Sequence, residues 1–185
     1  MTLGGREARK ENAMLSDTMT KAVNEQIKWE LYSGYLYLSM SAWFADKGMP
    51  GFTHWMRLQA QEELMHAMKF YDFLIERGGS VELHAVDAPP KSWASPLAVI
   101  QETLKHEQSV TARINELMNL AMNERDHATT IFLQWYVTEQ VEEEDNVGDV
   151  LAKLKLVGDK GEGLFMLDKE LGQRVLGASA QAMGA

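Results

Sequence analysis

The chain has 185 residues, of which 45% are hydrophobic and 24% are charged, and its formal net charge is −9. This composition is ordinary for a single globular domain, and the acidic balance argues against nucleic acid as a partner because phosphates are bound by Lys and Arg. The absence of cysteine excludes disulfides, Cys-ligated zinc, iron–sulfur clusters and thiol catalysis.

The two ends of the chain differ in composition from the middle. Residues 1–13 are polar and contain Gly4-Gly5, and residues 177–185 are mostly small, so we expect a disordered extension and a flexible tail around one domain over residues 14–176. No apolar run reaches the ~18 residues of a membrane span, and the N-terminus lacks the apolar stretch of a secretory signal. These features predict a cytoplasmic protein with no membrane partner.

Glycine, proline and polar breaks divide the rest into helices. Gly78-Gly79 is typical of a helix end, and Ser95-Pro96 is typical of an N-cap followed by the first helical residue. The predicted helices span residues 17–46, 52–77, 96–123, 126–157 and 162–172. Residues 80–94 contain Pro89-Pro90 and no clear period, so they are expected to run the length of the molecule. The sequence therefore predicts an all-α four-helix bundle with one long crossover and a short fifth helix.

Each long helix has core positions at alternating spacings of four and three residues, with glutamate near the middle. In the fourth helix these positions are predicted to be Ala128, Phe132, Trp135, Glu139, Glu142 and Asn146. Buried, unpaired carboxylates cost several kcal/mol, and a group of them would repel one another. A bound pair of cations removes that conflict.

The central glutamates also lie at matching depth. Glu30 lies 18 residues before Gly48 and Glu63 lies 15 after it, while Glu107 and Glu139 each lie 16 residues from Asn123. At ~1.5 Å per residue, all four are ~22–27 Å from their turns. This agreement favours a shared metal site over four surface positions.

His66 follows Glu63 by three residues on the same helix face, which indicates a ligand pair. Oxygen ligands with one imidazole suit Fe, Mn or Mg better than structural zinc. Two cations bridged by a carboxylate are used in redox or hydrolytic chemistry. Because no phosphate-binding loop or nucleophile–base pair accompanies the site, redox chemistry at two irons is favoured.

Five motifs carry a resemblance to a known family. They are Asn24-Glu25-Gln26 with Trp29-Glu30-Leu31-Tyr32-Ser33, Ala60-Gln61-Glu62-Glu63 with His66, Lys105-His106-Glu107-Gln108, residues 132–137 with Glu139-Gln140, and residues 161–164 with 168–171. Over about residues 14–172, the chain resembles the prokaryotic non-haem ferritins, which have the ferritin-like four-helix fold. The resemblance implies a cytoplasmic cage of 24 subunits that oxidises Fe(II) with O2 or H2O2 and stores the ferric mineral.

Carried over by position, the family's iron ligands fall on residues of this chain. The resemblance implies that Glu30, Glu63 and His66 hold the first iron, and that Glu63 bridges to a second iron held with Glu107 and Glu143. A third iron position corresponds to Glu62, Glu139, Glu142 and Glu143. The remaining matches are an electron-donating tyrosine, Tyr37, and two residues that support the ligands, Gln140 and Trp135.

Two departures from the pattern of the related bacterioferritins argue against a haem-binding protein. Bacterioferritins carry a second Glu-x-x-His on the fourth helix and a haem-ligating methionine after the second-helix glutamate, whereas this chain has Glu142 and Leu64 there. No haem is therefore expected at that position. Three alternatives stay open at this point: a haem-binding bacterioferritin, a cage subunit without an oxidase centre, and a di-metal oxidoreductase that does not store iron.

Overall fold

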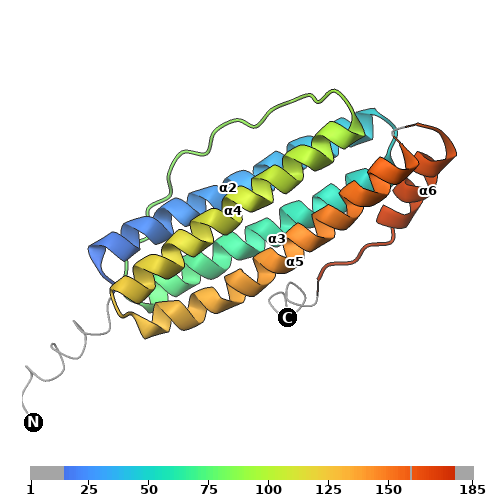
Figure 1. The fold of residues 1–185 in the computed structure, drawn as a ribbon. Helices are drawn as coiled ribbons and strands as arrows, with labels where there is room; N and C mark the ends of the chain where they lie inside the picture. The colour runs from blue at the N-terminus through green and yellow to red at the C-terminus, as the bar shows by residue number, and fades with distance from the viewer. Residues whose placement is uncertain (1–14, 159, 178–185) are drawn as a thin grey trace, which may run out of the picture.

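The computed structural model describes residues 15–158 and 160–177, and this part of the chain contains five helices and no strand. The helices are α2 (Asp17–Asp46), α3 (Pro50–Glu76), α4 (Pro96–Asn123), α5 (His127–Val157) and α6 (Gly161–Leu171) (Figure 1). The predicted all-α bundle with a short fifth helix is confirmed, and every predicted boundary lies within two residues of the observed one. The predicted extension over residues 1–13 and most of the predicted tail lie outside the described residues.

Side-chain caps explain where three of the long helices begin. Ser16 Oγ accepts a hydrogen bond from Met19 N at 2.9 Å, and Ser95 Oγ accepts one from Ala98 N at 3.2 Å. Asp126 caps α5 by accepting from Thr129 N at 3.1 Å, so α5 begins one residue later than predicted. Each cap satisfies a backbone N–H that has no partner within the first helical turn.

The long connection between α3 and α4 runs along the outside of the bundle beside α2 (Figure 1). Asn24 holds its first part, because its side chain donates to Ser80 O at 2.9 Å and accepts from Glu82 N at 2.8 Å. Ser39 Oγ holds its second part by donating to Pro90 O at 2.6 Å. The connection therefore joins two antiparallel hairpins, α2–α3 and α4–α5, as predicted.

α6 packs across one end of the bundle, and Asp168 fixes it to the start of α3. Asp168 Oδ1 accepts a hydrogen bond from Phe52 N at 2.9 Å. A Cβ at Gly51 would lie only 1.6 Å from Asp168 O, so this contact requires glycine. None of the helices in residues 15–158 and 160–177 has the length and apolar character of a membrane span.

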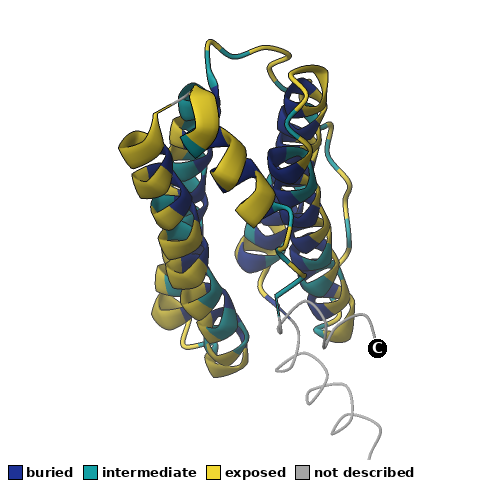
Figure 2. Cartoon of the chain, turned by 90° about the vertical axis from the view of Figure 1, so that its right-hand side faces the viewer, coloured by how far each residue is buried: buried dark blue, intermediate teal, exposed yellow. Residues whose placement is uncertain are grey.

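Buried residues line the inner faces of the helices (Figure 2) and form two separate apolar clusters. One cluster, near the α2–α3 turn, includes Phe44, Phe52 and Ile100; the other, near the α4–α5 turn, includes Ile27, Phe70 and Ile114. A buried polar layer separates them in all four long helices. Its members are Glu30, Gln59, Glu62, Glu63, His66, Glu107, Gln140 and Glu143.

The predicted core face of α5 is wrong by one residue. The buried positions are Thr129, Leu133, Tyr136, Gln140, Glu143 and Val147, whereas Ala128, Glu142 and Asn146 are exposed. The large aromatic residues at 132 and 135 suggested the wrong face, because both lie at the edge of the core rather than in it. Phe132 stacks on Phe73 from the flank, with ring centroids 3.8 Å apart. Since one residue turns a helix by about 100°, this shift moves Glu142 to the surface.

Candidate metal centre

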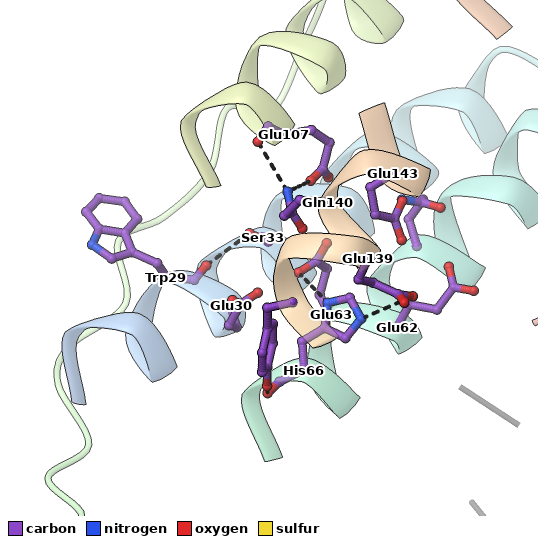
Figure 3. Close-up of polar contacts among 12 residues, drawn as sticks. Trp29, Glu30, Ser33, Glu62, Glu63, His66, Glu107, Glu139, Gln140 and Glu143 are labelled. Carbon is purple, nitrogen blue, oxygen red and sulfur yellow. Dashed lines mark hydrogen bonds and ion pairs between the residues drawn. The ribbon is translucent and has the colours of Figure 1, made fainter. Parts of the chain in front are cut away.

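The α2–α3 hairpin brings three of the predicted ligands together. Glu30 from α2 and Glu63 and His66 from α3 each offer one ligand atom, and these atoms lie within 4.8 Å of one another (Figure 3). All three side chains are buried. The Glu-x-x-His spacing places Glu63 and His66 one helical turn apart on the same face of α3, as the sequence predicts.

Two carboxylate oxygens of this group are buried without a hydrogen-bond partner in the described part of the chain. They are Glu30 Oε2 and Glu63 Oε2. The other oxygen of Glu30 accepts from Gln26 Nε2 at 2.7 Å, so the carboxylate is oriented with one oxygen left for another ligand. Buried polar atoms in folded proteins almost always have a partner. A cation bound by these oxygens would supply one.

The α4–α5 hairpin adds two buried carboxylates, and neutral side chains from three residues donate hydrogen bonds to them. Glu107 accepts a hydrogen bond from the Tyr37 phenol and another from Gln140 Nε2, which lies 3.2 Å from Glu107 Oε2. Glu143 Oε2 accepts from Gln59 Nε2 at 2.8 Å. Glu107 and Glu143 therefore differ from Glu30 and Glu63, which each keep a buried oxygen without a hydrogen-bond partner in the described part of the chain.

Burial and mutual repulsion raise the pKa values of these carboxyl groups. Burial raises the pKa of Glu107 to about 7, although the hydrogen bonds from Tyr37 and Gln140 oppose the shift. Burial and the charge of Glu107 raise the pKa of Glu143 to about 7. Burial, followed by the charges of Glu107 and Glu30, raises the pKa of Glu63 well above its usual range. The metal-free centre therefore holds protons that a bound cation would displace.

Neighbours on α5 hold His66 in place. Tyr136 donates a hydrogen bond to the backbone oxygen of His66 at 2.7 Å, and the Trp135 ring packs edge-on against the imidazole with centroids 5.4 Å apart. His66 Nδ1 lies 3.6 Å from Glu63 Oε2, and Nε2 lies 4.0 Å from Glu139 Oε1. Trp135 thus touches the predicted ligand directly, although it is only partly buried.

Tyr37 is fully buried and lies beside the centre, as its spacing from Glu30 suggests. Its phenol donates to Glu107, and burial together with the charge of Glu107 raises the pKa of Tyr37 well above its ordinary value. The phenol therefore stays protonated near neutral pH. Its hydrogen bond gives it a direct path for passing a proton to a carboxylate of the site.

The four residues expected at a third iron position do not share one environment. Glu62 and Glu143 are buried, and the Glu139 side chain is 12% exposed. Glu142 faces solvent beside a surface groove that also includes Thr111, Glu144 and Asp145. The described arrangement brings Glu62, Glu139 and Glu143 to the polar layer and leaves Glu142 outside it.

Two glutamines with direct contacts to the carboxylates were not predicted as site residues. Gln26 lies four residues before Glu30, and Gln59 lies four residues before Glu63. Both are buried and each donates to a carboxylate of the centre. A signal was present for Gln26, because residues four apart share a helix face and an amide at that spacing can reach the next turn. Gln59 donates instead to Glu143 on α5, and a contact between helices leaves no such spacing.

The donor set fits a pair of hard cations. Carboxylate oxygens and one imidazole suit iron, and the buried oxygens without partners give such ions a place among the side chains. Gln26 orients the first ligand, while Tyr136 and Trp135 position the histidine, as supporting residues do in metal sites.

Comparisons with known proteins agree with this geometry. The ferritin family model, described as a ferritin-like domain, matches residues 20–157. The bacterial non-heme ferritin of Bacteroides fragilis is 42% identical over 161 residues, which cover 87% of this chain and 100% of that protein. The bacterial non-heme ferritin of Escherichia coli O6:H1 is 43% identical over 158 residues, covering 85% of this chain and 96% of that one.

A solved structure is similar over nearly the same range. The open pore ferritin from the hyperthermophilic archaeon Archaeoglobus fulgidus is 54% identical and has a TM-score of 0.86, covering 87% of this chain and 99% of that chain. Family model, relatives and fold all agree: the chain belongs to the ferritin family.

Proposed function

We propose that this protein stores iron: it oxidises Fe(II) at a two-iron centre inside each subunit and holds the ferric product within a cage of 24 copies. The observation that carries the proposal is the group of Glu30, Glu63 and His66, buried within 4.8 Å of one another, with two carboxylate oxygens that lack partners in the described chain. We also propose that the cage works in the cytoplasm.

In this proposal Glu30, Glu63 and His66 hold the first Fe(II), and Glu63 bridges to a second Fe(II) held with Glu107 and Glu143. Two Fe(II) ions give two electrons to O2, which takes up two protons and leaves as H2O2. H2O2 can itself accept two electrons from a further pair of Fe(II) ions and two protons, which gives two water molecules. Anionic oxygen ligands favour this direction because they stabilise Fe(III) more than Fe(II). Protons displaced from the carboxyl groups on binding leave the site fully anionic.

Tyr37 would serve as an additional electron donor beside the second iron. Its phenol is hydrogen-bonded to Glu107, so loss of an electron can be coupled to transfer of the phenolic proton to that carboxylate. Among the remaining predicted residues, Gln140 and Trp135 would orient Glu107 and His66. Glu62, Glu139 and Glu143 would form the third iron position. Glu142, the fourth residue predicted there, would contact that iron only if its exposed side chain turned inward. No haem is proposed next to Glu63, because Leu64 is not a haem ligand.

Exposed apolar residues on the α2–α3 hairpin support the assembly. Tyr35 and Leu38 on α2 are each 51% exposed, and Leu64 and Met68 on α3 are 52% and 43% exposed. The members of each pair are three or four residues apart and so share one helix face, and an exposed apolar face is the kind of surface that a protein interface covers. Copies of this chain are the proposed partners.

The test combines oxidation with particle mass. Fe(II) added in air to the pure protein should be oxidised faster than in buffer, and the oxidised iron should elute with a particle of roughly 500 kDa, from about 24 copies. If a folded sample shows no fast oxidation, the proposed oxidase activity is wrong, and the alternative of a cage subunit without an oxidase centre is favoured. Fast oxidation by a monomer or dimer would instead favour a di-metal oxidoreductase.

A further inference from the structure

The chain does not end at α6: residues 172–177, which we name the C-terminal strap, turn back onto α3 (Figure 1). The carbonyl oxygen of Arg174 bonds to His54 Nε2 at 2.9 Å. The Arg174 guanidinium lies over the Trp55 ring, 5.1 Å from its centroid. Two contacts on the first half of α3 thus fix the strap before it reaches the polar layer.

The strap binds both oxygens of Glu62. Arg174 Nη2 donates to Glu62 Oε2 at 2.7 Å, and the backbone N–H of Gly177 donates to Glu62 Oε1 at 3.0 Å. The Glu62 side chain is 5% exposed and that of Arg174 is 18% exposed, so the ion pair is largely shielded from water. The attraction between the two charges is stronger in such surroundings than on the surface, because less water screens it.

Glu62 is unlike the other buried carboxylates of the layer. Glu30, Glu107 and Glu143 accept hydrogen bonds from neutral side chains, and Glu30 and Glu63 each have an oxygen without a hydrogen-bond partner in the described chain. Glu62 alone among these five has a cationic side chain of the same chain bound to it. The negative charge of Glu62 helps to raise the pKa of Glu143, so Glu62 is electrostatically part of the centre.

We propose that Arg174 determines how many metal ions the centre holds. The guanidinium supplies at Glu62 the positive charge that a third ion would otherwise supply, so the centre binds two ions while the strap is in place. A third ion binds Glu62, Glu139 and Glu143 only when it displaces Arg174. The inference rests on the proposed function, since it assumes that the centre binds metal.

The hold of the strap is incomplete, which makes displacement feasible. Arg174 Nη1 is buried and has no hydrogen-bond partner among the described residues. An ion pair removed from water is costly when some of its donors stay unsatisfied. A divalent cation that offers more charge at the same oxygens can therefore compete. By reciprocity, a third ion weakens binding of the strap by the same factor as the strap weakens binding of the ion, so removing the charge of Arg174 should strengthen binding of the ion.

Metal titration of the assembled protein tests this. Zn²⁺, which is not oxidised, is added to the metal-free protein, and the number and affinity of ions per subunit are measured by calorimetry. Wild type should bind two ions tightly and a third weakly. Arg174→Gln, which keeps an amide but removes the charge, should raise the affinity for the third ion about tenfold or more without changing the first two. Arg174→Lys, which keeps the charge, should resemble wild type.

Lys153→Gln is the matched control, because it removes one positive charge from an ion pair with Glu170, 2.7 Å long, between α5 and α6. It should leave all three affinities unchanged. Glu62→Gln should lose the third ion whether or not Arg174 is present. Each variant is first checked for wild-type particle mass and helical content.

The outcomes separate the two proposals. If Arg174→Gln binds the same number of ions with the same affinities as wild type, Arg174 does not set the stoichiometry. If wild type binds two ions but none of the variants gains or loses a third, the centre is confirmed as dinuclear and the role of the strap is refuted. If wild type binds no Zn²⁺, the two-metal centre itself is wrong and the inference about the strap is wrong with it.

Discussion

The two hairpins contribute to the polar layer in different ways. Each contributes two of the four carboxylates proposed to hold the two irons, between the same two apolar clusters. Those of α2–α3, Glu30 and Glu63, have oxygens without partners and an adjacent imidazole. Those of α4–α5, Glu107 and Glu143, already accept hydrogen bonds from Tyr37, Gln140 and Gln59.

This difference has a consequence for binding order. Hydrogen bonds from neutral donors offset part of the cost of burying Glu107 and Glu143. These hydrogen bonds must weaken or rearrange when a cation binds. Glu30 and Glu63 make fewer such bonds, so less is lost when they bind a cation. The α2–α3 hairpin should therefore bind the first ion tightly, and the α4–α5 hairpin should complete a weaker second position.

The largest effect is expected at the carboxylate proposed to serve both positions. Glu63→Ala should abolish fast Fe(II) oxidation, lowering the initial rate by more than about 100-fold, the upper end for residues that merely support a metal site. Stopped-flow absorbance of the ferric product measures this. Glu76→Ala is the control, since Glu76 is an exposed glutamate on the same helix. Fast oxidation by Glu63→Ala would show that the two positions do not share this residue.

The next effect tests the asymmetry itself. Glu30→Gln should weaken the first ion strongly, whereas Glu107→Gln should leave the first ion bound and weaken the second by about tenfold or more. Zn²⁺ titration of the two variants in parallel separates the steps. Equal losses at both steps in both variants would mean that the hairpins act as one symmetric site and that the binding order is wrong.

Much of this arrangement could be predicted from local sequence. Ser95 and Pro96 mark the start of α4, and Gly78 marks the end of α3, because caps and turns depend on neighbouring residues. The depth of Glu30, Glu63 and Glu107 follows from counting residues along helices of constant rise. These predictions are confirmed because each depends on a property that the chain expresses locally.

The remaining features depend on tertiary contacts. The face of α5 could not be read from its aromatic residues, because Trp135 and Phe132 pack at the edge of the core while the smaller Leu133 and Gln140 enter it. Arg174 lies in a segment without any helical period, and its contact with Glu62 joins residues 112 apart in sequence. Such a contact leaves no periodic signal.

A smaller effect is expected at Tyr37, the α2 residue whose phenol donates a hydrogen bond to Glu107. Tyr37→Phe removes a hydrogen bond that lowers the pKa of Glu107, so that pKa should rise and protons should compete more strongly with the second ion. The pH midpoint for binding the second Zn²⁺ should move upward, and Fe(II) oxidation near pH 6.5 should slow severalfold, by roughly 2- to 10-fold. Tyr35→Phe, an exposed tyrosine on the same helix, serves as the control.

The outcome for Tyr37 separates two roles. A shift in the binding midpoint identifies the hydrogen bond as the relevant contribution. Slower oxidation at saturating metal, with no change in the midpoint, would instead favour electron donation by the phenol. If neither quantity changes, Tyr37 is only a core residue and its hydrogen bond to Glu107 has no functional consequence.

The last prediction concerns the stability of the metal-free protein rather than its metal binding, and it depends on the α4–α5 carboxyl groups. Burial raises the pKa values of Glu107 and Glu143 to about 7 from an ordinary 4.5. Between these values the folded state keeps protons that the unfolded state has lost. The free energy of unfolding should therefore fall, by a few kcal/mol, as pH rises from about 4.5 to about 7.

Denaturant unfolding in the presence of a chelator measures this slope. Glu107→Gln with Glu143→Gln should make it shallower, because neither amide titrates and only Glu63 of the three groups remains, and adding Zn²⁺ to wild type at pH 7.5 should restore the lost stability by replacing protons with a cation. If the double variant keeps the wild-type slope, the proton-holding groups lie elsewhere, with Glu63 on the α2–α3 hairpin the first to examine because burial also raises its pKa. The two hairpins would then differ in hydrogen bonding but not in how they respond to protons.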